Sequence, residues 1–156
     1  MKSNNFFSSQ VSNHCGLHAL QNVFCNKNIY PTMLNKIAEN IAEETGDQVQ
    51  NHSSITGFWS LETLRRFIES KPTLQTLNHI NDNNNKRTWV DNDRKDCIGY
   101  LLHLPRQQHY VCARWSENDL EYVDSYNSGP ILTTLTAIQT QCTKNGWNVF
   151  GIYGTP

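Results

Sequence analysis

The sequence predicts an α+β fold in which helices come first and an antiparallel sheet follows. Up to residue 68, apolar residues recur at spacings of three and four, the period of a helix with one buried face. From residue 98 onward they alternate with other residues, which is typical of strands. The length of 156 residues suits one domain. We therefore expect a single domain over residues 1–156, with helices layered against a sheet.

Three helices are predicted in the first half of the chain. Residues 15–26 and 32–44 each carry apolar side chains on one face. A third helix begins after Ser60, a residue that suits the N-cap position, and continues through Ile68. The connection that follows the second helix is short, acidic and polar.

Residues 98–104, 109–115 and 120–125 have the periodicity of strands. The last two of these segments flank the turn Ser-Glu-Asn-Asp, so we expect them to form an antiparallel hairpin. This hairpin would bring the start of its first strand close to the end of its second.

A last helix is expected to open at a Ser-Gly-Pro motif, with Pro130 near its first position, and to stop at Gly146. Residues 147–153 then form a closing strand. The segment 71–95, which includes the Asn-rich stretch 81–87, is interpreted as a loop because Asn tolerates turn conformations.

Composition and charge narrow the class of function. The chain has 13 Lys and Arg against 14 Asp and Glu, a net charge of −1, so it lacks the basic footprint of a nucleic-acid partner. Its five cysteines are an odd number without a C-x-x-C pair, which favours a reducing compartment over a disulfide framework. We expect neither a secretory leader nor a membrane span, because the sequence lacks apolar runs of the required kind and length. We expect a cytoplasmic monomer, or one in the host cytosol if the source is an intracellular pathogen.

The most informative local feature is Cys15, where a polar loop gives way to the first predicted helix. A helix N-terminus presents unpaired N–H groups and partial positive charge, which favours the nucleophilic thiolate. Gln10, five residues upstream, has a side-chain amide suited to stabilising an oxyanion. The alternative is a buried cysteine that packs at a helix start.

A cysteine nucleophile needs a base, and the base needs a group that orients it. His109 opens one strand of the predicted hairpin and Asp124 ends the other, so the two become neighbours if the register places them on one face. His109 would then take the proton of Cys15, and Asp124 would hold the imidazole. Separately, each residue also fits a simpler role, as a strand-end histidine and a turn aspartate.

A metal site is the competing interpretation of the same segment. His14, Cys15 and His18 are placed at positions i, i+1 and i+4, but no paired cysteine or nearby carboxylate completes a tetrahedral set. We expect no metal or other cofactor, and interpret His18 as a core histidine that braces the helix. Phe58 and Trp59 precede the third helix, and they either join the core or line a substrate-binding groove.

These motifs together resemble the Josephin domain, the papain-related cysteine protease fold of a class of deubiquitinases. The pattern runs from Gln10 to Phe24, with the cysteine five residues after the glutamine and a histidine three residues later. Gly-Phe-Trp-Ser at 57–60, the segment RQQHYVCAR and the segment EYVDS follow in family order. The resemblance covers nearly the whole chain and is closest to the short stand-alone Josephin proteins.

The resemblance implies a papain-like cysteine protease fold of the Josephin type, with a helical subdomain and an antiparallel sheet. It assigns Cys15 as nucleophile, His109 as general base and acid, Asp124 as the orienting residue and Gln10 as the oxyanion-hole residue. The implied activity is deubiquitination, the thiol-dependent hydrolysis of the isopeptide, ester or peptide bond after the C-terminal glycine of ubiquitin. Ubiquitin or ubiquitin chains are the implied partners.

One departure from the family lies between residues 31 and 56, where longer members have a helical hairpin that helps to grip ubiquitin. This chain has room there for about one helix. Two other functions remain open at this stage. One is a ubiquitin-directed cysteine deamidase or transglutaminase, which shares the same catalytic groups. The other is an inactive ubiquitin-binding module, against which the intact set of predicted catalytic residues argues.

Overall fold

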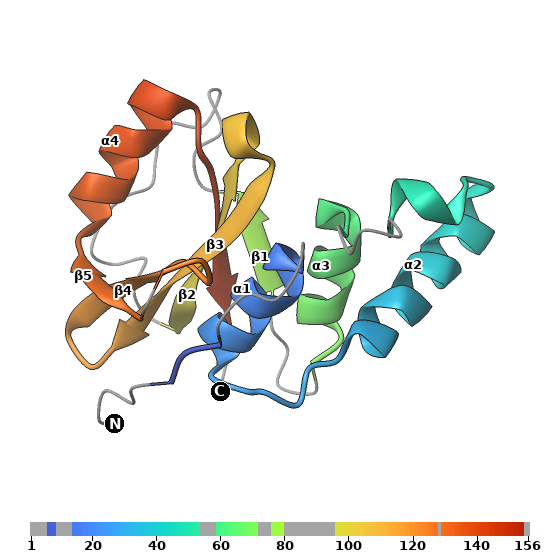
Figure 1. Cartoon of the computed structure of the whole chain (residues 1–156), viewed down its shortest axis with the longest axis horizontal. Coiled ribbons are helices and arrows are strands. Elements are labelled where there is room, and N and C mark those ends of the chain that lie inside the picture. The colour runs from blue at the N-terminus through green and yellow to red at the C-terminus, as the bar shows by residue number, and fades with distance from the viewer. Residues whose placement is uncertain are drawn as a thin grey trace.

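The structure, a computed structural model, describes residues 6–8, 14–53, 59–71, 76–79, 96–127 and 129–154. Within these ranges the chain is α+β, as predicted (Figure 1). The helices are α1 (Cys15–Phe24), α2 (Pro31–Thr45), α3 (Leu61–Glu69) and α4 (Leu135–Asn145), with short 3-10 turns η1 (Val49–Asn51) and η3 (Pro105–Gln107). The strands are β1 (Thr76–His79), β2 (Cys97–Leu104), β3 (His109–Ser116), β4 (Asp119–Val123), β5 (Ile131–Thr133) and β6 (Asn148–Tyr153).

The described strands form one antiparallel sheet in the order β1-β6-β2-β3-β4-β5. Buried residues of α1 and α3 form a core against one face of this sheet, together with Leu101 and Cys112 from its central strands. Ile138 of α4 joins a second core on the other face, with Leu102 and Val111. The alternation of side chains along the central strands therefore supplies two cores, one for each face.

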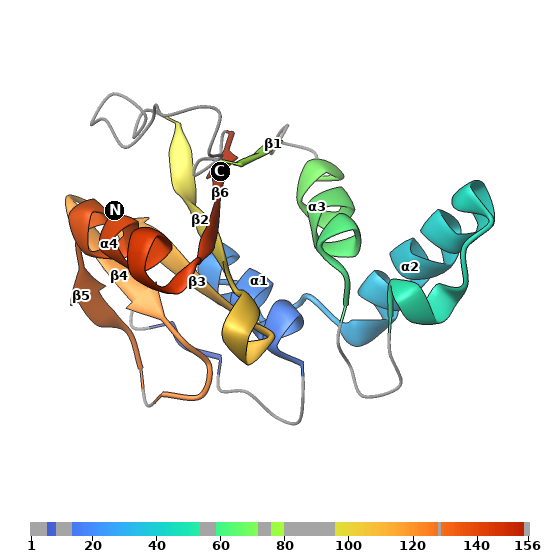
Figure 2. The ribbon, with the colours of Figure 1, turned by 90° about the horizontal axis from the view of Figure 1, so that it is seen from above.

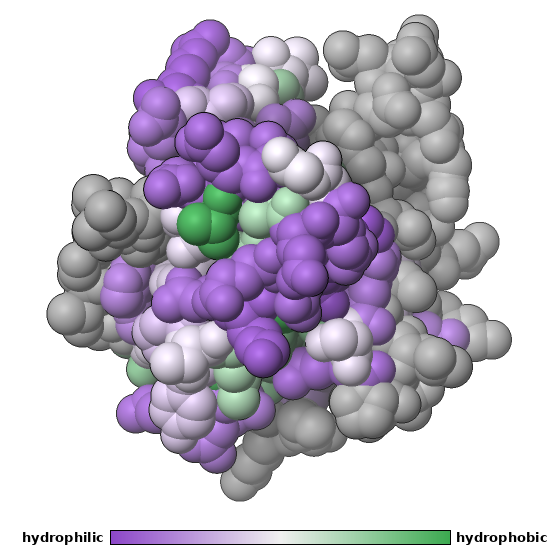
Figure 3. Space-filling view, turned by 90° about the vertical axis from the view of Figure 1, so that its right-hand side faces the viewer, coloured by the Kyte–Doolittle hydropathy of each residue, from purple (hydrophilic) through white to green (hydrophobic). Residues whose placement is uncertain are grey.

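The helices α2 and α3 form an arm beside the sheet, with α3 between α2 and the rest of the molecule in both views (Figures 1 and 2). Leu34, Ala38 and Ile41 are the buried residues of α2. An ion pair of 2.8 Å between Arg66 of α3 and Glu44 of α2 links the two helices. The side of the molecule that carries α2 is mostly hydrophilic, with small apolar areas (Figure 3).

The first three predicted helices are confirmed. Ser60 is the N-cap of α3, because its side chain accepts a hydrogen bond from the backbone N–H of Thr63. Pro31 begins α2, where its missing N–H costs nothing. The predicted strands of the second half are also present, and β3 and β4 form the predicted hairpin.

Two sequence predictions are wrong. The last helix does not begin at the Ser-Gly-Pro motif: residues 131–133 form β5, which pairs with β4, and α4 begins only after Thr134, whose side chain accepts from Ala137 N–H. Its stop at Gly146, in the left-handed region, is as predicted. Residues 76–79 are not a loop but strand β1, paired with β6. Four residues are too few to show a period, so only the pairing reveals them.

Gly99 shows how closely α1 and the sheet approach each other. A Cβ at this position would lie 2.4 Å from the carbonyl oxygen of Ala113 on β3 and 2.9 Å from Cγ2 of Val23 on α1. The pairing of β2 with β6 also shifts register between Cys97 and Gly99. The absence of a side chain at Gly99 therefore permits the close approach of both β3 and α1 to β2.

We predict that Gly99→Ala lowers the free energy of unfolding by about 1–3 kcal/mol, because backbone atoms at the contact cannot move aside without strain. Urea denaturation followed by circular dichroism measures the change. Gly129→Ala is the matched control, since a Cβ added at Gly129 would meet no atom within 4 Å. Equal stability of the two variants would contradict the close approach described for Gly99.

Candidate active site

Cys15 is the first residue of α1 and is buried, with 4% of its surface exposed. His14 occupies the N-cap position, and its side chain makes no capping hydrogen bond to the helix. The first turn of α1 contains no acidic residue. The thiol therefore lies at the positive end of a helix whose charge is not offset by a carboxylate in its own first turn.

His109 and Asp124 come together because of the register between β3 and β4. The ladder ends with Cys112 opposite Val123. Continuing it by one residue places Asp124 opposite Val111, which shares a face of β3 with His109. Nε2 of His109 donates a hydrogen bond of 2.8 Å to Oδ1 of Asp124. The contact predicted from the hairpin is therefore present, and both side chains are largely buried.

His109 also connects to the nucleophile candidate. Cys15 is the other group that acts on this imidazole, through hydrogen bonding and charge that both raise its pKa. Burial by itself lowers the pKa of His109, but hydrogen bonds and charges from Asp124 and Cys15 outweigh burial and raise the pKa to about 9. Because Nε2 is engaged by Asp124, Nδ1 is the nitrogen left for the thiol. The imidazole is therefore protonated at neutral pH and held between two anionic or potentially anionic groups.

Asp124 has its own supporting contacts. Burial raises the pKa of this carboxyl, but hydrogen bonds from His109 and from the backbone N–H of Tyr126 lower it overall. Oδ1 accepts from that N–H at 3.0 Å. The carboxylate is thus ionised and fixed in rotation by two donors, which suits a residue that orients an imidazole.

Polar side chains of α1 hold the N-terminal segment against the helix. The side-chain amide of Asn22 accepts from the backbone N–H of Ser8 at 2.6 Å and donates to its carbonyl at 3.1 Å. Nδ1 of His18 lies 2.8 Å from Oγ of Ser8 and 2.9 Å from Oε1 of Gln21. His18 is therefore a buried, hydrogen-bonded histidine, as predicted, and burial lowers its pKa.

Arg114 extends this network to the sheet. Its guanidinium donates to the backbone carbonyls of Asn22 and Phe6 at 2.8 and 2.7 Å, and to Glu121 at 2.9 Å. Arg114 is 3% exposed. Sequence reasoning missed Arg114 and Glu121 because an arginine and a glutamate on strands usually face solvent, and only their tertiary contacts reveal the buried pair.

The remaining predicted residues have different positions. Trp59 is 2% exposed and belongs to the core, so in this conformation it offers almost no surface to a substrate. Its Nε1 donates to Asn35 of α2 at 3.0 Å, and its ring lies 5.2 Å from that of His14. Gln10 and Phe58 lie outside the described residues. The two histidines considered above as metal ligands therefore have other neighbours. His14 lies against the ring of Trp59, and His18 is hydrogen-bonded to Ser8.

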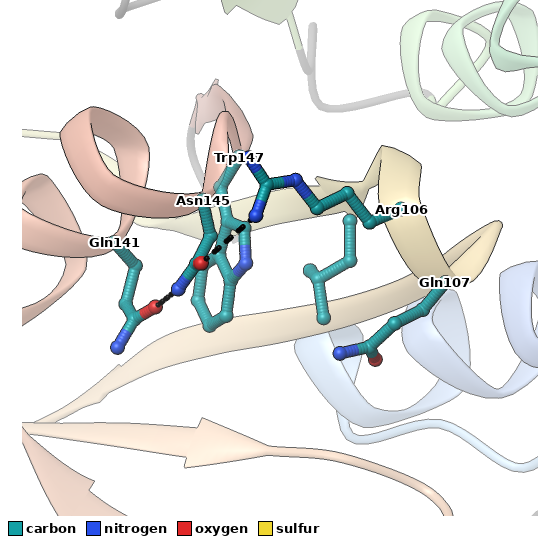
Figure 4. Close-up of a pocket in the computed structure, with 6 residues that line it drawn as sticks. Arg106, Gln107, Gln141, Asn145 and Trp147 are labelled. Carbon is teal, nitrogen blue, oxygen red and sulfur yellow. Dashed lines mark hydrogen bonds between the residues drawn. The ribbon is translucent and has the colours of Figure 1, made fainter.

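A separate pocket of about 170 Å³ lies where η3 meets the end of α4 (Figure 4). It is lined by Leu104, Arg106, Gln107, Gln141, Asn145 and Trp147. Arg106 and Asn145 approach each other across it at 3.5 Å. Neither Cys15 nor His109 lines this pocket, so its polar groups are not part of the cysteine site.

Two further findings concern the described residues alone. No group of three or more His, Cys, Asp or Glu side chains in these ranges is arranged to hold a metal ion. In the same ranges, no helix combines the length and the apolar composition needed to cross a membrane.

No protein-family model matches the chain, and no curated protein matches its sequence. The site combines a thiol at a helix N-terminus, an imidazole that interacts with it and a carboxylate hydrogen-bonded to the imidazole, which are the parts from which an activated cysteine nucleophile is built.

We predict that Cys15 is the cysteine most readily alkylated by iodoacetamide at neutral pH. His109→Ala should slow this alkylation about tenfold or more, because the thiolate rather than the thiol reacts and its cationic partner is lost. Peptide mass mapping identifies the modified residue. Cys142 is the internal reference, since burial raises its pKa to about 11. Equal rates in the wild type and His109→Ala would remove His109 from the activation of Cys15.

We predict that the imidazole of His109 titrates near pH 9 in the wild type and at clearly lower pH in Asp124→Asn. The carboxylate stabilises the imidazolium, so its neutral replacement favours deprotonation. NMR titration of the imidazole resonances measures both values. His103, whose pKa is lowered by burial, serves as the control that should not change. An unchanged His109 titration would contradict the role of Asp124.

Proposed function

We propose that the protein is a cysteine hydrolase with a papain-like fold of the Josephin type, and that it cleaves the bond after the C-terminal glycine of ubiquitin. The observation that carries the chemical part is the hydrogen bond between His109 and Asp124, together with the interaction of Cys15 with the same imidazole, which helps to raise its pKa. These residues come from α1, β3 and the end of β4, and the fold brings them together. The choice of ubiquitin rests on the resemblance of four sequence motifs to Josephin deubiquitinases.

In the proposed mechanism, the thiolate of Cys15 attacks the glycine carbonyl carbon and forms a tetrahedral intermediate. As the bond from carbon to the lysine nitrogen breaks, His109 gives its proton to the leaving amine. The glycine is then held as a thioester on Cys15. His109, now neutral, takes a proton from water, which attacks the thioester, releases the ubiquitin carboxylate and restores the thiolate.

Asp124 contributes throughout this cycle without changing its own protonation. Its carboxylate accepts from Nε2 of His109, so the imidazole keeps Nδ1 directed to the thiol and the leaving group. Gln10 is proposed to stabilise the oxyanion with its side-chain amide. In sequence it follows Ser8 by two residues, and Ser8 is fixed on α1 by Asn22. No metal or organic cofactor is part of the proposed reaction.

The experiment that tests this proposal is reaction with ubiquitin-propargylamide, in which an alkyne replaces the scissile carbonyl. We expect an adduct of the wild type that is absent from Cys15→Ala. His109→Ala should retain its fold by circular dichroism but lose turnover of diubiquitin by a factor of about 100 or more. No wild-type adduct, or an adduct that persists in Cys15→Ala, would refute the deubiquitinase proposal.

The same samples separate the two other functions. A deamidase or transglutaminase would alter a glutamine of ubiquitin, so the intact mass of ubiquitin would change without cleavage of its C-terminal bond. An inactive ubiquitin-binding module would bind ubiquitin in a titration but give neither adduct nor mass change. Either result would replace the proposed hydrolysis with the corresponding alternative.

A further inference from the structure

Tyr126 is an exposed aromatic residue that lies against the candidate active site. Its ring stacks on the imidazole of His109, with centroids 4.9 Å apart and planes inclined by 25°. The residue is nevertheless 63% exposed. One face of the ring thus covers the buried imidazole, while much of the remaining residue faces solvent.

The backbone around Tyr126 fixes where this ring points. The backbone N–H of Asn127 donates to the carbonyl of Asp124 at 2.9 Å, which closes a tight turn. Within that turn, the N–H of Tyr126 donates to Oδ1 of Asp124, the same oxygen that accepts from His109. Tyr126 therefore holds the carboxylate through its backbone and touches the imidazole through its ring.

The turn that follows β4 explains why the ring reaches His109. The paired part of β4 ends at Val123, and the turn that begins at Asp124 carries Tyr126 to the start of β3, where its ring meets the imidazole. A flat aromatic ring at this position limits the rotation of the imidazole and keeps water from one side of its hydrogen bond to Asp124. The stack also places a π face against an imidazole that is cationic at neutral pH, which is a favourable arrangement.

We propose that Tyr126 is a positioning residue for His109, and that its ring borders the side of the site where the amine leaves. The second half of this proposal rests on the proposed function, because in that function His109 is the group that protonates the leaving amine. The stem of a lysine leaving group is a chain of methylenes, which packs favourably on an exposed aromatic surface. The first half concerns the geometry of His109 and Cys15 alone, so it can be tested without any substrate.

The substrate-free test is the rate of alkylation of Cys15 by iodoacetamide. We expect Tyr126→Ala to slow alkylation by roughly tenfold, since a loosened imidazole pairs less well with the thiolate. Tyr126→Phe keeps the ring and the turn, so it should react at the wild-type rate. Leu132→Ala is the surface control, because Leu132 follows the same turn on β5 and is 69% exposed. Wild-type rates in Tyr126→Ala would overturn the positioning role.

The kinetic test uses two ubiquitin substrates that differ in the leaving group. With a lysine isopeptide, Tyr126→Ala should lose roughly tenfold to a hundredfold in kcat with little change in KM, and Tyr126→Phe should restore kcat. With an aminocoumarin amide, whose amine is less basic, the loss should be smaller because less proton donation is needed. Equal losses on both substrates, or a change confined to KM, would overturn the leaving-group part of the proposal.

Reaction with ubiquitin-propargylamide keeps this inference separate from the proposed function. A wild type that forms no adduct refutes the proposed function, and the alkylation rates still decide whether Tyr126 positions His109. A wild type that forms the adduct, together with unchanged alkylation and kcat in Tyr126→Ala, refutes the role of Tyr126 alone. Thermal melting of each variant checks that a slower rate does not come from unfolding.

Discussion

The antiparallel pairing of β3 with β4 is the constraint on which the candidate site depends. It determines which residue at the end of β4 lies beside His109 at the start of β3. A slip of one residue would turn every side chain of one strand to the opposite face and separate His109 from Asp124. The register is secured by the two cores, because Val123 and Cys112 belong to one face while Leu120 belongs to the other.

The position of α1 is the second requirement, because the sheet supplies the base but the helix supplies the thiol. Gly99 lets α1 approach the strands closely, and Arg114 connects the carbonyl of Asn22 on α1 to Glu121 on β4. Separating a buried guanidinium from its carboxylate and carbonyl partners would strongly destabilise the fold, so these contacts favour a single placement of the helix. The start of α1, which carries the thiol, is thereby held against the sheet.

The parts of the fold that the sequence predicts are those with a clear period or a cap, such as the first three helices and the hairpin. The pairing of His109 with Asp124 follows from the hairpin and needs no knowledge of other elements. By contrast, β1 is defined only by its partner β6, and no local pattern in residues 76–79 reveals it. Tyr126 could have been noticed, since it follows Asp124 by two residues, but only the turn shows that its ring meets His109.

Burial favours the neutral form of each of these ionisable groups, and what separates the site from the core is whether neighbouring groups outweigh the effect of burial. Burial raises the pKa of Cys97 and Cys112, so these thiols remain protonated, and it lowers the pKa of His103. His109 is buried as well, yet its pKa is raised, because Asp124 and Cys15 supply charge and hydrogen bonds that a core position lacks. The fold therefore produces a cationic histidine at the start of β3, which interacts with the thiol of Cys15 at the start of α1 that its charge can activate.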